Sequence, residues 1–150
     1  MVEIGSPAPE FELLSDAEET VRLSSLRGHK VVIYFYPKAD TPGCTKQACA
    51  LRDAYPQIEE KDAQVIGISP DLPKKLVKFR EKYNLPFVLL SDPDHAVAEA
   101  YGAWGEKKMY GKTYYGITRS HFAIDEEGVL TEVGIKVKPL STADLAIKLL

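Results

Sequence analysis

A continuous apolar run from Val31 to Tyr36 constrains the fold of this chain more than any other segment. Every residue in it is β-branched or aromatic, and Pro37 ends the run. Such a run is typical of a strand buried on both faces, which occurs in sheets covered by helices on either side. It is much shorter than the roughly 20 apolar residues that cross a membrane. We therefore expect an α/β fold and no contact with a membrane.

Strand-like and helix-like segments alternate along most of the chain. The expected strands cover residues 31–36, 65–69, 87–90, 117–124 and 129–135. The expected helices cover residues 42–55, 72–83, 92–102 and 141–150. This alternation favours parallel strands joined by crossover helices, and a turn at residues 125–128 adds an antiparallel pair. The sequence thus predicts a single domain over residues 1–150, with a central mixed β-sheet and helices on both faces.

Several of these elements depend on particular residues. Apolar residues alternate on either side of Ser15 and Asp16, which favours an N-terminal hairpin. Asp92 is suited to cap a helix whose first residue would be Pro93, and Ser141 is suited to cap the last helix. Leu72 is expected to begin the apolar face of the second helix, whose other face is basic and exposed to solvent.

Charge and cysteine content narrow the function classes. Nineteen Lys and Arg stand against 22 Asp and Glu, a formal net charge of -3, so there is no basic excess to neutralise nucleic-acid phosphates. Two cysteines are too few for the disulfide scaffold of a small secreted protein. The opening residues, MVEIGSPAPEF, lack the basic and apolar regions of a signal peptide. We expect a cytoplasmic protein that binds no nucleic acid.

The first cysteine follows the most buried strand. Thr41 is a suitable helix cap and Pro42 a suitable first helical residue, which places Cys44 in the first turn. Unpaired backbone N–H groups and the positive end of the helix dipole favour an anion there. A thiol in this place loses its proton more readily, and the thiolate is the nucleophilic form. The alternative is an inert buried cysteine, which is common in proteins.

The second cysteine, Cys49, lies five residues further along the same expected helix. Helix geometry places the two Cα atoms ~8.6 Å apart, beyond the ~7 Å at which a disulfide closes without backbone movement. A disulfide between Cys44 and Cys49 therefore requires local unwinding. The spacing also differs from the Cys-x2–4-Cys pattern of zinc sites, and the three histidines show no ligand spacing. We expect no metal.

Arg119 lies inside the expected strand at residues 117–124. A buried arginine needs an anionic partner because an unpaired buried charge is costly. That partner could be a cysteine thiolate or a carboxylate, unless the strand is an exposed edge. Strand alternation places His121 on the same face as Arg119.

These residues together resemble a known family. Pro37, Thr41 and Cys44 fit the Pro-x3-Thr-x2-Cys signature of the peroxiredoxins, and Arg119 matches their active-site arginine. The run Gly-Cys-Thr-Lys-Gln-Ala-Cys, which ends at Cys49, is similar to the Q-type subfamily, also called bacterioferritin comigratory proteins.

The resemblance implies a thioredoxin-like fold and a thiol-dependent peroxidase that reduces hydrogen peroxide and organic hydroperoxides without metal or bound cofactor. By position, Cys44 would be the peroxidatic cysteine and Cys49 the resolving one, joined in a disulfide that thioredoxin or a similar dithiol reduces. Thr41 and Arg119 would orient the peroxide, and Pro37 would shield the site.

Some alternatives stay open at this point. The family resemblance leads us to expect a small hydroxyl residue at the position of His121. The histidine either adjusts the proton balance of the pocket or changes its packing. A thioredoxin-type oxidoreductase would have Cys-x-x-Cys, and a redox sensor would consume one equivalent of peroxide. No separate interface signal is visible, so we expect a monomer.

Overall fold

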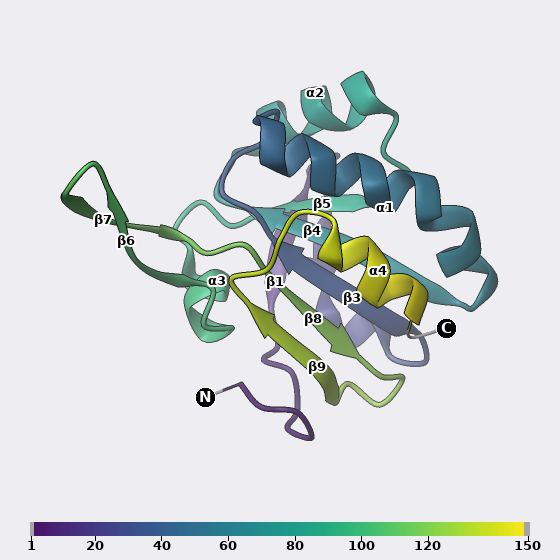
Figure 1. Cartoon of the computed structure of the whole chain (residues 1–150). Helices are drawn as coiled ribbons and strands as arrows, with labels where there is room; N and C mark the ends of the chain where they lie inside the picture. The colour runs from purple at the N-terminus through teal and green to yellow at the C-terminus, as the bar shows by residue number, and fades with distance from the viewer. Residues whose placement is uncertain (1, 149–150) are drawn as a thin grey trace.

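The computed structural model describes residues 2–148, and these form one large sheet and a two-stranded arm (Figure 1). The large sheet has seven strands in the order β2-β1-β5-β4-β3-β8-β9. Its strands are β1 (Glu12–Ser15), β2 (Thr20–Arg22), β3 (Lys30–Phe35), β4 (Ala63–Ser69), β5 (Val88–Ser91), β8 (Ser120–Ile124) and β9 (Leu130–Ile135). Strands β3, β4 and β5 are parallel, whereas β8 and β9 join antiparallel. The predicted mixed sheet is therefore confirmed.

Helices cover both faces of this sheet, as predicted. One face carries α1 (Pro42–Glu60), α2 (Pro73–Tyr83) and α4 (Ser141–Lys148). The other carries α3 (Ala96–Ala100) and the short 3-10 helix η1 (Leu23–Leu26). No helix in the described part of the chain is long and apolar enough to cross a membrane.

The central strand β3 shows why its apolar run is unbroken. Val32 and Tyr34 belong to the core beneath α1, α2 and α4, whereas Ile33 and Phe35 belong to the core on the opposite face. Because successive side chains of a strand point to opposite faces, a strand covered on both sides needs apolar residues at every position.

The N-terminal hairpin is confirmed, and it extends the main sheet. β1 pairs with β2, with Leu13 opposite Val21, and β1 also pairs with β5. The Ser15 hydroxyl accepts hydrogen bonds from the N–H groups of Ala17 and Glu19, which closes the turn.

Two predicted helix limits are wrong. The first helix was expected to end before Pro56, and the second was expected to begin at Leu72. α1 continues through Pro56 to Glu60. The proline removes one backbone hydrogen bond, but Ile58 beyond it is fully buried in the core, and that burial favours continued helix. α2 begins at Pro73, and Leu72 before it is 60% exposed instead of facing the core.

Two predicted caps also act differently. α3 begins at Ala96, not at Pro93, because His95 before it has left-handed backbone. Asp92 still serves this helix, since its carboxylate accepts the N–H groups of Val97 and Ala98 at 3.3 and 2.9 Å. Ser141 is the first residue of α4, and its hydroxyl donates to the carbonyl of Lys138 instead of accepting a helix N–H. The predicted end of this helix, residues 149–150, lies outside the described residues.

The expected strand at residues 117–124 is broken, and an arm precedes it. β6 (Trp104–Met109) and β7 (Lys112–Ile117) pair only with each other, and β8 begins at Ser120. Arg119 thus lies at the junction of β7 and β8 and not inside a strand. Residues 104–117, called the arm from here on, stand away from the main sheet (Figure 1). Because most arm side chains face solvent, the sequence lacks the apolar alternation that would have predicted these strands.

Candidate active site

The site begins where β3 passes into α1. Thr41 is extended (φ -94°, ψ 157°) and precedes Pro42, the first helical residue. The Thr41 carbonyl accepts the N–H of Thr45 at 2.8 Å, which is the first bond of the helix. Cys44 therefore lies in the first turn, as predicted, and its side chain is buried. Pro37 is half-buried in the loop that connects the strand to the helix.

The Thr41 side chain does not act as a cap. Its hydroxyl donates to the carbonyl of Lys38 at 2.8 Å, within the loop. The N–H groups of Gly43 and Cys44 lie in the first turn, where no carbonyl of the same helix can reach them. With the positive end of the helix dipole, they favour negative charge at the sulfur of Cys44.

Arg119 supplies a full positive charge at the same place. Its Nη2 donates to Cys44 Sγ at 3.3 Å. The guanidinium lies close against Gly43, where an added Cβ would be only 3.0 Å from Arg119 Nη2. A side chain at position 43 would therefore crowd the guanidinium.

The second bond of the guanidinium goes to Gln47, whose Oε1 accepts from Arg119 Nη1 at 2.6 Å. Among the described residues Arg119 makes no salt bridge to a carboxylate. Of the partners that the sequence left open, the structure therefore places the Cys44 sulfur beside the arginine, together with a neutral amide.

Gln47 belongs to a buried polar network that the sequence did not predict. Its Nε2 donates to Thr142 Oγ1 at 2.9 Å, and His121 Nδ1 lies 2.9 Å from the same oxygen. Gln47 follows Cys44 by three residues, so helical spacing could have placed the two on one face. Thr142 comes from α4 and carried no such signal.

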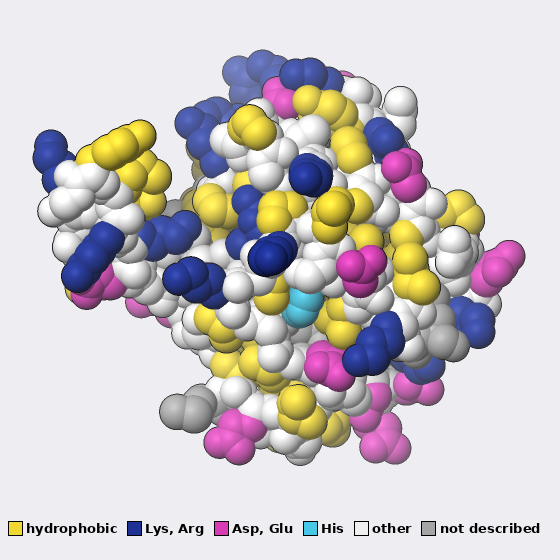
Figure 2. Space-filling model, in the orientation of Figure 1, with side chains coloured by type: hydrophobic (Ala, Val, Ile, Leu, Met, Phe, Trp, Pro, Cys, Tyr) yellow, Lys and Arg dark blue, Asp and Glu magenta, His cyan; other side chains and the backbone are white. Residues whose placement is uncertain are grey.

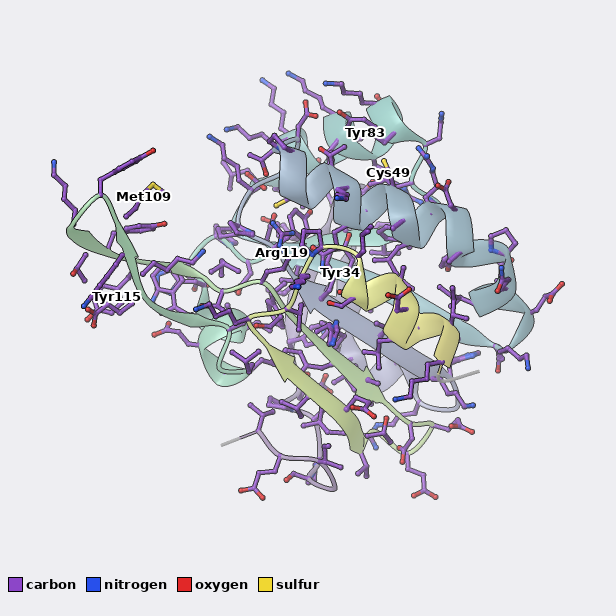
Figure 3. The ribbon with its side chains drawn as sticks, viewed as in Figure 1. Tyr34, Cys49, Tyr83, Met109, Tyr115 and Arg119 are labelled. Carbon is purple, nitrogen blue, oxygen red and sulfur yellow. The ribbon has the colours of Figure 1, made fainter. Side chains whose placement is uncertain are left out.

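Cys49 lies apart from this cluster. Figure 3 shows Cys49 on the side of α1 nearer Tyr83 of α2, whereas Arg119 lies on the opposite side of the helix. Both cysteines are free, Cys44 buried and Cys49 partly exposed. Because α1 is unbroken from 42 to 60, its geometry keeps the two Cα atoms ~8.6 Å apart.

A groove of about 620 Å³ opens beside Arg119. The residues that line it come from the arm, the β7–β8 junction and the segment after β9: Glu106, Lys107, Lys108, Tyr114, Thr118, Arg119, Lys136 and Val137. Figure 2 shows Lys and Arg side chains gathered where the arm meets the body. Burial, and then the charge of Arg119, lower the pKa of Lys107 from its usual value. The groove therefore offers a basic approach to the guanidinium.

Within residues 2–148, no group of three or more His, Cys, Asp or Glu side chains is placed to hold a metal ion. The reactive groups that the geometry brings together are a thiol, a guanidinium and helix-start N–H groups, which suit nucleophilic sulfur chemistry.

Comparison with known proteins agrees with this geometry. Residues 4–133 match the model of the AhpC/TSA family. Peroxiredoxin Bcp of Bacillus subtilis is 53% identical over 137 residues, which cover 91% of this chain and 87% of that protein. The chain belongs to the AhpC/TSA family. The predicted resemblance to Q-type peroxiredoxins is thereby confirmed.

Solved structures of this family share the fold. A PrxQ of Xylella fastidiosa, solved as a cysteine-to-serine mutant, has a TM-score of 0.92 and 30% identity, with 99% of this chain and 94% of that chain covered. The bacterioferritin comigratory protein of Xanthomonas campestris, studied for its alkyl peroxide reduction activity, has a TM-score of 0.89 and 34% identity, with coverage of 99% and 95%. The predicted thioredoxin-like fold is confirmed by these similarities.

Proposed function

We propose that Cys44 is the peroxidatic cysteine of this thiol-dependent peroxidase and Cys49 its resolving cysteine. The observation that carries the proposal is the 3.3 Å contact between Arg119 Nη2 and Cys44 Sγ at a helix start. Two sources of positive potential meet there at one sulfur, which is what a reactive thiolate needs. The substrates are hydrogen peroxide and organic hydroperoxides, and the groove beside Arg119 is their proposed approach.

In the first step the Cys44 thiolate attacks the terminal peroxide oxygen. A sulfur–oxygen bond forms and the oxygen–oxygen bond breaks, so the sulfur is oxidised to a sulfenic acid and the peroxide is reduced. The leaving oxygen departs as water or an alcohol after it takes a proton. Arg119 and the first-turn N–H groups stabilise the negative charge that moves onto this oxygen. We also propose that Thr41 orients the peroxide and that Pro37 shields the site, both from the loop before α1.

In the second step Cys49 attacks the sulfenic sulfur. A disulfide forms, and the hydroxyl leaves as water with the proton of the Cys49 thiol. Because helix geometry holds the cysteines too far apart, the first turns of α1 must unwind before this step. A thioredoxin-like dithiol then reduces the disulfide by thiol–disulfide exchange. A monomer in the cytoplasm, where such dithiols are kept reduced, remains our prediction.

A coupled assay tests the function. Peroxide is added to the protein with thioredoxin, thioredoxin reductase and NADPH, and NADPH oxidation is followed. We expect many equivalents of peroxide to be consumed per chain, whereas a redox sensor would consume only one.

Two variants test the roles of the cysteines in this assay. Cys44→Ser should abolish turnover and keep the fold, as judged by circular dichroism. Cys49→Ser should retain the first oxidation of Cys44 and lose turnover with thioredoxin. Substantial turnover by Cys44→Ser would show that another group is the nucleophile.

A further inference from the structure

A chain of hydrogen bonds runs from the Cys44 sulfur through the interior to His121. It passes from Arg119 to Gln47 and then to Thr142, at successive distances of 3.3, 2.6, 2.9 and 2.9 Å between bonded atoms. Gln47 and Thr142 are fully buried, and His121 is 8% exposed. Buried polar groups of this kind are held in one arrangement, because each lost bond leaves a group without a partner.

The arrangement has a definite direction. The Arg119 guanidinium can only donate, so the Gln47 oxygen accepts and the Gln47 amide donates to the Thr142 oxygen. The Thr142 hydroxyl still has its own proton, and it can donate this proton to Nδ1 when His121 is neutral with its ring proton on Nε2. Every bond then points the same way, from Arg119 towards the imidazole, and each one strengthens the next.

Protonation of His121 reverses the last bond. Both ring nitrogens of an imidazolium are donors. Gln47 and His121 would then both donate to the Thr142 oxygen, and the Thr142 proton would lose its acceptor in this chain. The hydrogen bond from the Gln47 amide to Thr142 would then weaken, and Gln47 would orient the Arg119 guanidinium less firmly.

We propose that His121 is a positioning residue for peroxide reduction, which as the neutral imidazole holds Arg119 against Cys44 through Thr142 and Gln47. The proposal rests on the assignment of Cys44 as the peroxidatic cysteine. His121 touches neither the peroxide nor the sulfur, and it acts only through the bonds of the chain.

The packing around His121 gives the ring little freedom. A Cβ added at Gly134, the residue paired with His121 in β9, would lie 2.6 Å from both Cδ2 and Nε2 of the ring and 3.0 Å from Val137 Cγ1. The imidazole therefore lies close against the backbone of Gly134, where any larger residue would displace it.

The groups around His121 favour its neutral form. Burial lowers its pKa, although Glu132 of β9 acts in the opposite direction. Tyr34 is its partner across β3, and burial raises the pKa of this phenol well above its usual value, so it stays uncharged. Thr142 of α4, which is bonded to the imidazole, and Gln47 of α1, which is bonded to Thr142, are both uncharged. The charged residue nearest to His121 in the sequence is Arg119, just before β8. The imidazole is thus neutral near pH 7. It gains its proton only at a pH below the ordinary histidine pKa of 6.5.

The test measures the rate of Cys44 oxidation per thiolate. Stopped-flow oxidation by hydrogen peroxide is recorded from pH 8 to pH 5, and each rate is divided by the thiolate fraction from absorbance at 240 nm. We expect the corrected wild-type rate to fall about three- to tenfold towards pH 5, the effect of one lost hydrogen bond. His121→Asn places an amide oxygen near the position of Nδ1 and cannot titrate. It should match the wild type at pH 8 and stay level down to pH 5.

Thr142 gives an independent test. Thr142→Val keeps the shape of the side chain and removes the hydroxyl, so its corrected rate should be about three- to tenfold lower at pH 8 and level with pH. Thr142→Ser restores the hydroxyl and should restore both the rate and its pH dependence. If Thr142→Val fails to fold, the comparison of wild type with His121→Asn decides.

The proposal is overturned if the corrected wild-type rate is level with pH, or if His121→Asn shows the same fall. It is also overturned if a folded Thr142→Val reacts as fast as the wild type at pH 8. These outcomes differ from a failure of the proposed function, in which wild-type Cys44 would not react with peroxide at any pH.

Discussion

At the scale of single residues, the positive potential at the Cys44 sulfur depends on the neutral side chain of Gln47 as much as on the charge of Arg119. A carboxylate at position 47 would neutralise the guanidinium, whereas an amide fixes its orientation and leaves its charge uncompensated. That charge is then directed at the Cys44 sulfur, which lies 3.3 Å away. In the proposed mechanism, Arg119 therefore stabilises both the thiolate before attack and the leaving oxygen during it.

Replacing Arg119 by Met should slow the peroxide step by about 100-fold or more, because removal of one preorganised donor commonly has an effect of this size. Stopped-flow oxidation of the reduced protein measures it. Arg22→Met is the matched control, since Arg22 is exposed and paired with Glu12 on the N-terminal hairpin. Equal rates for Arg119→Met and wild type would remove Arg119 from the site.

Tyr34 offers a prediction about stability. Its hydroxyl is buried, and among the described residues it has no hydrogen-bond partner. Tyr34→Phe removes this unpaired group, so it should stabilise the fold by about 1 kcal/mol and raise Tm by about 2–4 °C. Tyr101→Phe is the matched control, because the Tyr101 hydroxyl donates to the carbonyl of Pro9 at 2.7 Å and its loss should lower Tm. A Tyr34→Phe variant that melts as low as Tyr101→Phe would contradict this account.

At the scale of elements, the proposed mechanism gives α1 two opposed tasks. As a helix it holds Cys44 at its positive end beside Arg119. Disulfide formation requires the same turns to open, since the helix separates Cys44 from Cys49. In that mechanism the N-terminal turns of α1 open locally at a lower free energy than the whole fold. The rest of α1 stays anchored by residues such as Leu51 and Ile58, which are fully buried.

Hydrogen exchange on the reduced and the disulfide-oxidised protein tests this division. Amides at residues 42–52 should exchange faster after oxidation, because the helical bonds there are broken. Amides of β3 and β4 in the same samples serve as the internal control and should keep their protection. Equal protection at 42–52 in both states, with the disulfide confirmed by mass spectrometry, would mean that α1 need not unwind.

At the scale of the whole molecule, the sheet provides the frame that brings the site together. β3 leads into the helix that carries Cys44, and β8 beside it begins directly after Arg119. α4 packs on α1 and brings Thr142 to Gln47. That residues 1–150 act as a single domain remains a prediction. The same buried network also links the stability of the whole fold to pH.

Global stability should fall as pH falls, in part through His121. Burial lowers its pKa below the ordinary 6.5, so between these two values the unfolded chain binds more protons than the native one. Stability from this source is complete above about pH 7 and decreases as pH falls from 6.5 to the folded pKa. Urea unfolding of wild type and His121→Asn at several values from pH 8 to pH 5 measures it. The difference between the two should change over this range; a constant difference would exclude His121 as the source.

Much of the fold could be predicted because it depends on local pattern. The run at 31–36 predicted the central strand, since burial on both faces demands apolar residues throughout. The arm could not be predicted in this way, because strands that face solvent carry no apolar period. The start of α3 also could not, since left-handed backbone at a non-glycine residue such as His95 leaves no reliable signal in the sequence.

For the site, local spacing was enough to place Cys44 at a helix start and Cys49 out of its reach, because helical geometry converts spacing directly into distance. The groups that surround the sulfur, in contrast, depend on tertiary packing. Arg119 lies at a junction outside any strand, and its neutral partner Gln47 is held in turn by Thr142 from the last helix. These contacts join segments far apart in the chain. They depend on how α1, β8 and α4 pack together, and no local pattern of residues encodes that packing.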